Sequence, residues 1–235
     1  MTYPRAVLTA WLLAALLTCA LAYDMAHAGE LSLEGGLGLS YFTPTIMDGT
    51  WANWGLDHTW KRDSLAYKVG LSYAFSPKWA VSVAYLNMGQ TGVDARTTLD
   101  DNDYDPMNHV CLKRCHSLGA FKVRDRMQGG ELTVTRSFPH GNWIPFVKVG
   151  AAVMVHNVQV VMIDNANIVP QQFHGNIPMT VLGGGIEYKP WHVALDTSWY
   201  HGLGGDDSGC IGGPCGWPIS KQVLVTTFGF RFPLF

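Results

Sequence analysis

Apolar and polar residues alternate with a period of two along most of the chain. Between Val147 and Val155 the odd positions carry valine or alanine, whereas Lys148, Gly150 and Ala152 occupy even positions. Successive side chains of a β-strand point to opposite faces, so this pattern predicts strands with one apolar face and one face of small or polar residues.

Eight segments share this pattern, at residues 31–39, 65–75, 79–85, 131–135, 147–155, 182–188, 193–199 and 224–232. Their second face is rich in glycine, alanine and serine, which suits the narrow interior of an eight-stranded barrel. An even number of strands lets both termini of the chain lie on the periplasmic side of the membrane. We therefore expect an all-β fold, an eight-stranded antiparallel up-and-down transmembrane β-barrel.

The connections between these segments are alternately short and long. Short turns are expected at residues 76–78, 139–142 and 189–192, and long links at 42–63, 91–126, 156–176 and 202–220. Short periplasmic turns and long extracellular loops are typical of outer-membrane barrels. The alternative, a soluble β-sandwich, would have to bury all of the apolar faces.

The first 28 residues have the layout of a secretory signal peptide. Arg5 is followed by an almost wholly apolar run over residues 6–22, and Ala26 and Ala28 offer small residues before Gly29. The sequence predicts a cleaved signal at 1–28 and a barrel domain at 29–235. An uncleaved membrane helix, for which the run is short, and a lipoprotein site before Cys19 are the alternatives.

The end of the chain resembles the C-terminal assembly signal of outer-membrane barrels. The positions that carry this resemblance are Thr227, Gly229, Phe232, Leu234 and the terminal aromatic Phe235. The resemblance implies recognition by the barrel-assembly machinery and a place in the outer membrane of a Gram-negative bacterium, among lipid and lipopolysaccharide. Pro233 cannot donate to a β-ladder, so we expect the last strand to stop at Phe232.

Two further stretches resemble small barrels of the OmpA/Opa-like superfamily. They are residues 142–151 (NWIPFVKVGA), and residues 183–188 (GGGIEY) with 194–200 (ALDTSWY) after a turn. The resemblance implies the same fold for the whole chain after the signal. In keeping with it, aromatic residues expected to form girdles at the membrane interfaces lie near the strand ends: Tyr41, Trp79, Trp143, Tyr188, Trp191, Trp199 and Phe232.

Charged residues of both signs fall on the inward positions of the predicted strands: Glu34, Lys68, Glu131, Lys148, Glu187, Asp196 and Arg231. Buried charges persist when they are paired and hydrogen-bonded. We therefore expect a charge network that plugs the lumen. A gated path for protons or ions is the functional alternative.

Four cysteines follow the signal, in two close pairs: Cys111 with Cys115, and Cys210 with Cys215. An even number of cysteines in an exported chain predicts disulfides, either within each pair or between the pairs. Cys111 and Cys115 lie between His109 and His116, so a zinc site is the alternative, and a stretched haem-attachment motif is a weaker one. We expect the chain to bind no metal and no cofactor.

The nearest approach to a hydrolase triad is formed by Asp196, Ser198 and His201. Ser198 and His201 differ in parity, so a regular strand places them on opposite faces. The His-x-Ser-Asn motif of the lipid A deacylase family is absent, since Gly202 and Leu203 follow His201. We therefore expect that the chain is not an enzyme.

The remaining candidates for contact with a partner are the loop tryptophans Trp51, Trp54 and Trp60, which can stack on sugars or anchor a protein ligand. A formal charge of −2 gives no support for a nucleic-acid partner. The sequence favours a structural or surface-interaction barrel whose loops bind a host or envelope ligand. A narrow channel for small solutes and a lipid A-modifying enzyme are the alternatives.

Overall fold

The computed structural model describes residues 29–44, 56–97, 120–162, 171–203 and 220–234. These residues form the short 3-10 helix η1 (Lys189–Trp191) and the strands β1 (Glu30–Pro44), β2 (Leu56–Lys61), β3 (Asp63–Ser76), β4 (Trp79–Thr97), β5 (Ala120–Ser137), β6 (Trp143–Met162), β7 (Gln171–Tyr188), β8 (Val193–Gly202) and β9 (Ser220–Pro233). No helix within the described ranges is long and apolar enough to cross a membrane.

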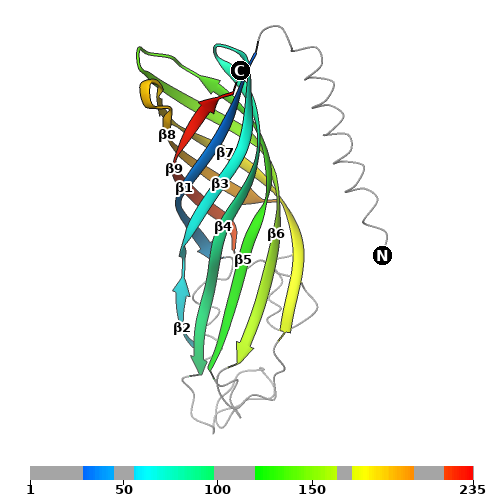
Figure 1. The fold of residues 1–235 in the computed structure, drawn as a ribbon. Helices are drawn as coiled ribbons and strands as arrows, with labels where there is room; N and C mark the ends of the chain where they lie inside the picture. The colour runs from blue at the N-terminus through cyan, green and yellow to red at the C-terminus, as the bar shows by residue number, and fades with distance from the viewer. Residues whose placement is uncertain (1–28, 45–55, 98–119, 163–170, 204–219, 235) are drawn as a thin grey trace, which may run out of the picture.

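Strands β1 and β3 to β9 close into a barrel, as Figure 1 shows. Each pairs antiparallel with its neighbours in the chain, and β1 pairs with β9 to complete the ring. The eight-stranded antiparallel barrel predicted from the sequence is therefore confirmed. Closure gives every strand two partners, which satisfies the backbone hydrogen bonds that lipid cannot satisfy.

The barrel has two different ends, here called the turn end and the loop end. The turn end carries the tight connections at residues 77–78 and 138–142 and the helix η1. The loop end is where the strands lead into residues 45–55, 98–119, 163–170 and 204–219. The regular alternation of short and long connections expected from the sequence is present.

The wall at the loop end is taller than the sequence pattern indicated. Part of the expected link 42–63 is strand β2, which pairs with the end of β4 and is separated from β3 by Arg62 alone. Strands β4 to β7 likewise run into the links expected at 91–126 and 156–176. The sequence missed these extensions because their outward residues lie beyond lipid and are polar, as at Arg124 and Arg126.

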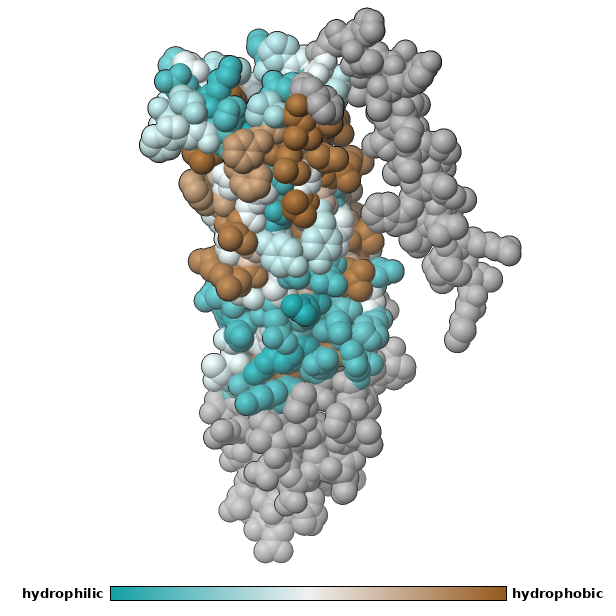
Figure 2. Space-filling model, viewed as in Figure 1, coloured by the Kyte–Doolittle hydropathy of each residue, from teal (hydrophilic) through white to brown (hydrophobic). Residues whose placement is uncertain are grey.

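The two faces of each strand differ as the alternation predicted. Leu65 on β3 is 78% exposed on the outer wall, whereas the next residue, Ala66, is 1% exposed inside. Aromatic rings gather at the turn end, where Tyr188 lies 4.6 Å from Trp143 and 5.5 Å from Trp191 between ring centroids. Figure 2 shows a hydrophobic band around the middle of the visible face, with hydrophilic surface on both sides.

The seam between β1 and β9 depends on glycine. A Cβ at Gly38 would overlap the carbonyl oxygen of Thr226, and one at Gly229 would overlap that of Gly35. The two backbones therefore approach too closely for a side chain at these points. Strand β9 continues one residue beyond the expected stop, since Pro233 pairs with Ser32 at the edge of the ladder.

Substitution of Gly38 by alanine should destabilise the barrel by about 1–3 kcal/mol, the usual cost of overpacking. The matched control is Gly36→Ala on the same strand and the same face, where the nearest atom to a new Cβ is the Thr227 Cβ at 3.2 Å. The free energy of unfolding in urea, measured on vesicle-reconstituted protein, checks this difference. Equal stability of the two variants would show that the seam can widen freely.

Candidate functional site in the barrel lumen

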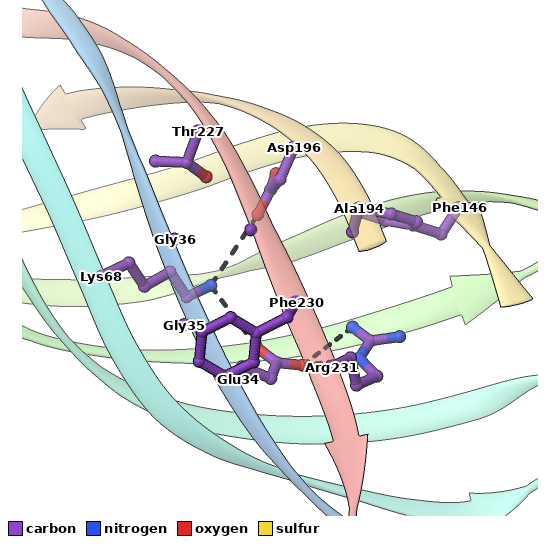
Figure 3. A pocket seen from close by; sticks show the side chains of 11 residues that line it. Glu34, Gly35, Gly36, Lys68, Phe146, Ala194, Asp196, Thr227, Phe230 and Arg231 are labelled. Atoms are coloured by element: carbon purple, nitrogen blue, oxygen red, sulfur yellow. Dashed lines mark hydrogen bonds and ion pairs between the residues drawn. The ribbon is translucent and has the colours of Figure 1, made fainter. Parts of the chain in front are cut away.

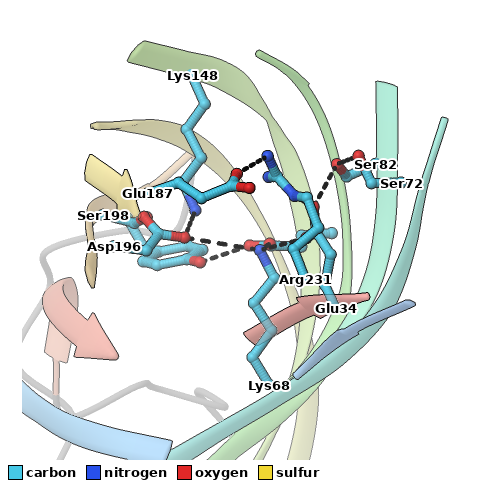
Figure 4. Close-up of polar contacts among 11 residues, drawn as sticks. Glu34, Lys68, Ser72, Ser82, Lys148, Glu187, Asp196, Ser198 and Arg231 are labelled. Carbon is cyan, nitrogen blue, oxygen red and sulfur yellow. Dashed lines mark hydrogen bonds and ion pairs between the residues drawn. The ribbon is translucent and has the colours of Figure 1, made fainter. Parts of the chain in front are cut away.

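A layer of ion pairs crosses the lumen in the turn-end half of the barrel. The seven charged residues named from the sequence all point into it, one from each of β1, β3, β5, β6, β7, β8 and β9. Four are acids and three are bases, and the two signs alternate around the ring except at the neighbouring strands β7 and β8, which carry Glu187 and Asp196. Figure 4 shows the side chains of Glu34, Lys68, Lys148, Glu187, Asp196 and Arg231 converging from the surrounding strands.

Lys68 lies at the centre of this layer. Its Nζ is 2.6 Å from Glu131 Oε1, 3.8 Å from Glu34 Oε2 and 3.8 Å from Asp196 Oδ2. The Lys68 side chain is 9% exposed and that of Glu131 is not exposed at all. A lysine desolvated to this degree keeps its charge because several carboxylates surround it.

The remaining acids have their own partners. Lys148 Nζ lies 2.5 Å from Asp196 Oδ2, and the Ser198 hydroxyl donates to Asp196 Oδ1 at 3.2 Å. The Tyr200 hydroxyl donates to the second oxygen of Glu131 at 2.5 Å. The charge layer is therefore extended by hydroxyl donors, as a buried polar network requires.

Arg231 joins two carboxylates at the turn end of the layer. Its Nη2 is 2.8 Å from Glu34 Oε1 and its Nη1 is 2.8 Å from Glu187 Oε2. The guanidinium also lies 5.9 Å from the centre of the Phe146 ring, within cation–π range. Together these contacts hold the side chain across the lumen.

A small hollow of about 40 Å³ lies beside this layer. Figure 3 shows Glu34, Lys68, Asp196 and Arg231 around it, and the small residues at its wall include Gly36. A cavity needs roughly 10–15 Å³ to hold one water molecule, so this hollow has room for only a few.

A layer of methionines fills the lumen on the loop-end side of the charges. The side chains of Met88, Met127, Met154 and Met179 are wholly buried and belong to one apolar cluster. On β5, β6 and β7 these methionines lie nearer the loop end than Glu131, Lys148 and Glu187 of the same strands. The two layers are therefore stacked along the barrel axis.

The methionine layer was not among the features predicted from the sequence, although Met154 lies between Val153 and Val155 within the predicted segment 147–155. Met127 and Met154 have the same parity as Glu131 and Lys148, so extension of the inward face along β5 and β6 would have found them. Beyond them lie Asp125 and His156, both buried, with His156 Nδ1 3.8 Å from Asp125 Oδ1.

Of the three residues considered for a hydrolase triad, Asp196 and Ser198 are in contact, but His201 does not join them. Ser198 faces the lumen and bonds to Asp196, whereas the His201 ring stacks against Trp199 with 5.2 Å between centroids. Thr227 and Gly229 of the assembly signal face inward, while Phe232 and Leu234 are exposed. Trp60 lies on β2 with its ring 6.0 Å from His58. The other predicted site residues lie outside the described residues: Trp51, Trp54, His109, Cys111, Cys115, His116, Cys210, Cys215 and Phe235.

Most of the chain matches the sequence profile of a known family. The profile of the OmpA-like transmembrane domain matches residues 27–201. The chain belongs to this family. It is thus an OmpA-like outer-membrane barrel, as the resemblance in its strands implied. No curated protein sequence matches the chain.

Several solved structures are similar to this OmpA-like barrel at low sequence identity. OprG from Pseudomonas aeruginosa is 13% identical, with 87% of this chain and 96% of that chain covered and a TM-score of 0.45. Ail, the attachment invasion locus protein of Yersinia pestis, is 11% identical, with coverage of 87% and 99% and a TM-score of 0.42. The outer membrane protease OmpT from Escherichia coli is 9% identical, with coverage of 87% and 97% and a TM-score of 0.45.

Removal of the central cation should destabilise this OmpA-like barrel strongly. Lys68→Met leaves Glu131 buried without its nearest cation, and breaking a buried pair in this way costs about 3–5 kcal/mol. The double variant Lys68→Met/Glu131→Gln removes both charges and should recover more than half of that loss. Urea unfolding followed by tryptophan fluorescence measures all three proteins.

The matched control is Lys78→Met, in an exposed turn, which should change stability by no more than about 0.5 kcal/mol. If Lys68→Met unfolded at the same urea concentration as Lys78→Met, the charge layer would not hold the lumen together.

Proposed function

We propose that this barrel is a closed membrane anchor of the structural or surface-interaction type, which presents its loop end to a ligand outside the cell. The observation that carries the proposal is the double filling of the lumen by a charge layer and a methionine layer. A barrel filled in this way has no evident use as a pore, so its function is assigned to its outer end.

The charge layer opposes the passage of ions. A solute moving along the axis would have to separate Lys68 from Glu131, or Arg231 from Glu34 and Glu187, within a narrow interior. Separation leaves charges without partners where water is scarce, which costs several kcal/mol. Thermal motion alone would seldom open such a layer.

The methionine layer opposes the passage of water and ions by a different physical effect. Its side chains present no charge and no strong hydrogen-bonding group, and apolar constrictions in channels close by excluding water. Because the two layers are stacked, opening one of them leaves the other in place.

The tall wall at the loop end supports the assignment of binding to that end. Strand β2 and the extended parts of β4, β5, β6 and β7 reach farther toward the loop end than β8 and β9 do (Figure 1). Sites on strands are held more rigidly than sites on free loops. Trp60 on β2 is the described candidate for ligand contact, and the proposed ligand is a host or envelope surface molecule.

Two alternatives from the sequence remain as competing functions. The narrow channel is favoured by the hollow beside Lys68 and Asp196, which would form the turn-end part of a path. A lipid A-modifying enzyme would need a nucleophile and a base in contact, and Ser198 and His201 lie on opposite faces. The channel is therefore the alternative that the experiment must address first.

Single-channel recording tests the closed lumen. We expect no steady current from the full chain reconstituted in a planar bilayer. Neutralising the central pair with Lys68→Gln/Glu131→Gln should leave the methionine layer closed, and Met127→Ala/Met154→Ala should leave the charge layer closed. The four substitutions combined should produce current, because both layers are then weakened.

Steady, ion-selective current from the unaltered chain would overturn the proposal and favour the channel. Current from the Lys68→Gln/Glu131→Gln variant alone would show that the methionines do not form an independent seal. Each variant is first checked for a folded barrel by its heat-dependent mobility on a gel.

The proposal also includes export and assembly. Residues 1–28 would be removed as a signal peptide, the C-terminal residues 227–235 would be recognised by the barrel-assembly machinery, and the four cysteines after the signal would form disulfides beyond the membrane. The match to the family profile begins at residue 27, which supports the signal peptide, and the C-terminal signal and the disulfides are supported by the sequence alone.

Mass spectrometry of the chain purified from outer membranes should find Gly29 as its first residue. The same spectrum, taken before and after reduction, should differ by the mass of four hydrogen atoms if two disulfides are present. A protein that retains its first 28 residues would favour the uncleaved membrane helix instead.

A further inference from the structure

A buried histidine adjoins the methionine layer on its loop-end side. His156 of β6 is 1% exposed, and it pairs directly with Met127 of β5, which is not exposed at all. Side chains of directly paired residues stand next to each other on one face of a sheet, so the imidazole and the thioether are neighbours within the lumen. On the other side, a Cβ at Gly175 of β7 would overlap Nε2 of His156, so the ring lies over that glycine.

The Nδ1 atom of this histidine is buried, and in the part of the chain that the structure describes it has no hydrogen-bond partner. Asp125 Oδ1 lies 3.8 Å from it, beyond hydrogen-bond distance. A buried polar atom without a partner is costly, so its presence in a folded protein calls for an explanation. A metal ion on Nδ1 would supply the missing partner, since neutral imidazole nitrogens are common metal ligands.

Three thioethers lie in the same region of the lumen. Met88 occupies the bulge of β4 beside Gly89, which pairs with Met127. The sulfur of Met154 lies over Gly129, because a Cβ there would be 2.9 Å from its Sδ, and Gly129 is the next inward residue to Met127 on β5. All three methionine side chains are wholly buried. Strands β4, β5 and β6 thus bring three sulfurs to the side of the lumen that holds the histidine.

This set of donor atoms favours a soft, monovalent cation. Among the described ranges no group of three His, Cys, Asp or Glu side chains could hold a metal ion, so harder ions such as Zn(II) lack a full set of ligands there. Thioether sulfur selects Cu(I), and imidazole also binds copper. The wholly buried carboxyl group of Asp125 beside the ring offers the negative charge that a buried cation requires.

We propose that Met88, Met127, Met154 and His156 form a binding site for Cu(I) at the loop-end side of the methionine layer. The thioether sulfurs and Nδ1 of the imidazole hold the ion, and its oxidation state does not change. Adaptable packing accounts for methionines in an apolar core, but it leaves the Nδ1 atom beside them unexplained. The sequence alone leads to the expectation of no metal, because only the register of β4, β5 and β6 brings these residues together.

The test measures metal binding to the full chain, folded in zwitterionic micelles. Free thiols are first alkylated without reduction, so that cysteines do not compete for the metal. The affinity for Cu(I) is measured by competition with bicinchoninate in the presence of ascorbate, and Ag(I), a redox-inert probe with the same ligand preference, is titrated by calorimetry. We expect tight binding of a single Cu(I) or Ag(I) ion per chain and much weaker binding of Zn(II).

The variant Met127→Leu/Met154→Leu removes two sulfurs but conserves side-chain volume, so the barrel should still fold. Its affinity for Ag(I) should fall at least about 100-fold, because the loss of even an outer-shell partner of a metal ligand costs 10–100-fold. The matched control is Met179→Leu in the same apolar cluster. Met179 pairs with Ala152, which is about 13 Å along β6 from His156, so its loss should leave the affinity unchanged.

The histidine has a matched control of its own. His156→Gln should weaken Ag(I) binding at least about 10-fold, whereas His174→Gln on the exposed face of β7 should not change it. In protein labelled with 13C at the methionine methyl groups, Ag(I) should shift the signals of the three ligand methionines and leave that of Met179 in place. Heat-dependent mobility on a gel checks that each variant is a folded barrel.

Three results would overturn the proposal: no binding of Ag(I), equal affinities in Met127→Leu/Met154→Leu and Met179→Leu, or binding of Zn(II) as tight as that of Ag(I). The first would mean that the methionines serve in packing alone, the second that the metal binds elsewhere on the chain, and the third that a harder set of ligands surrounds His156. None of these results bears on whether the lumen conducts, so failure here is distinct from failure of the closed-anchor proposal.

Discussion

The structure depends on one constraint, namely that backbone N–H and C=O groups within a membrane must bond to each other because lipid offers no partner. Closure of eight strands satisfies them, and the seam between β1 and β9 closes because Gly38 and Gly229 leave room for the two backbones. A ring of eight strands is narrow, so its inward side chains must fill each other's space. Everything inside the barrel follows from that lack of room.

Two kinds of side-chain layer fill the interior, one after the other along the barrel axis. In the turn-end half, Lys68 and Arg231 meet carboxylates, and the buried charges are tolerable because each has close partners of opposite sign. Nearer the loop end, methionine provides flexible apolar side chains that adapt to an irregular space. The lumen is consequently an internal core, with the same packing role as the core of a soluble protein.

The outer wall is also matched to its surroundings, which change from lipid to water along the barrel axis. Apolar side chains face the hydrocarbon, aromatic rings mark its edges, and the wall becomes polar where the strands pass beyond it. Arg124 and Arg126 of β5 lie at that transition, and the Arg124 side chain is held over Gly92. Because the lumen is filled, the surfaces of the barrel that remain accessible to a host or envelope ligand lie on its outside.

The sequence by itself determined the fold, because alternation with a period of two survives wherever one face meets lipid and the other meets the lumen. It also identified the residues of the charge layer, since the parity of Lys68 or Glu131 on a strand is a local property. Only the tertiary structure decided which charges meet, that methionines from β4 to β7 form a second layer, and that Lys61 lies in one row with Arg124. These facts depend on strand register and on closure of the ring, which bring together residues far apart in the chain. Beyond the lipid the alternation of hydrophobicity ends, and for that reason β2 and the tall ends of β4 to β7 were not visible in the sequence pattern.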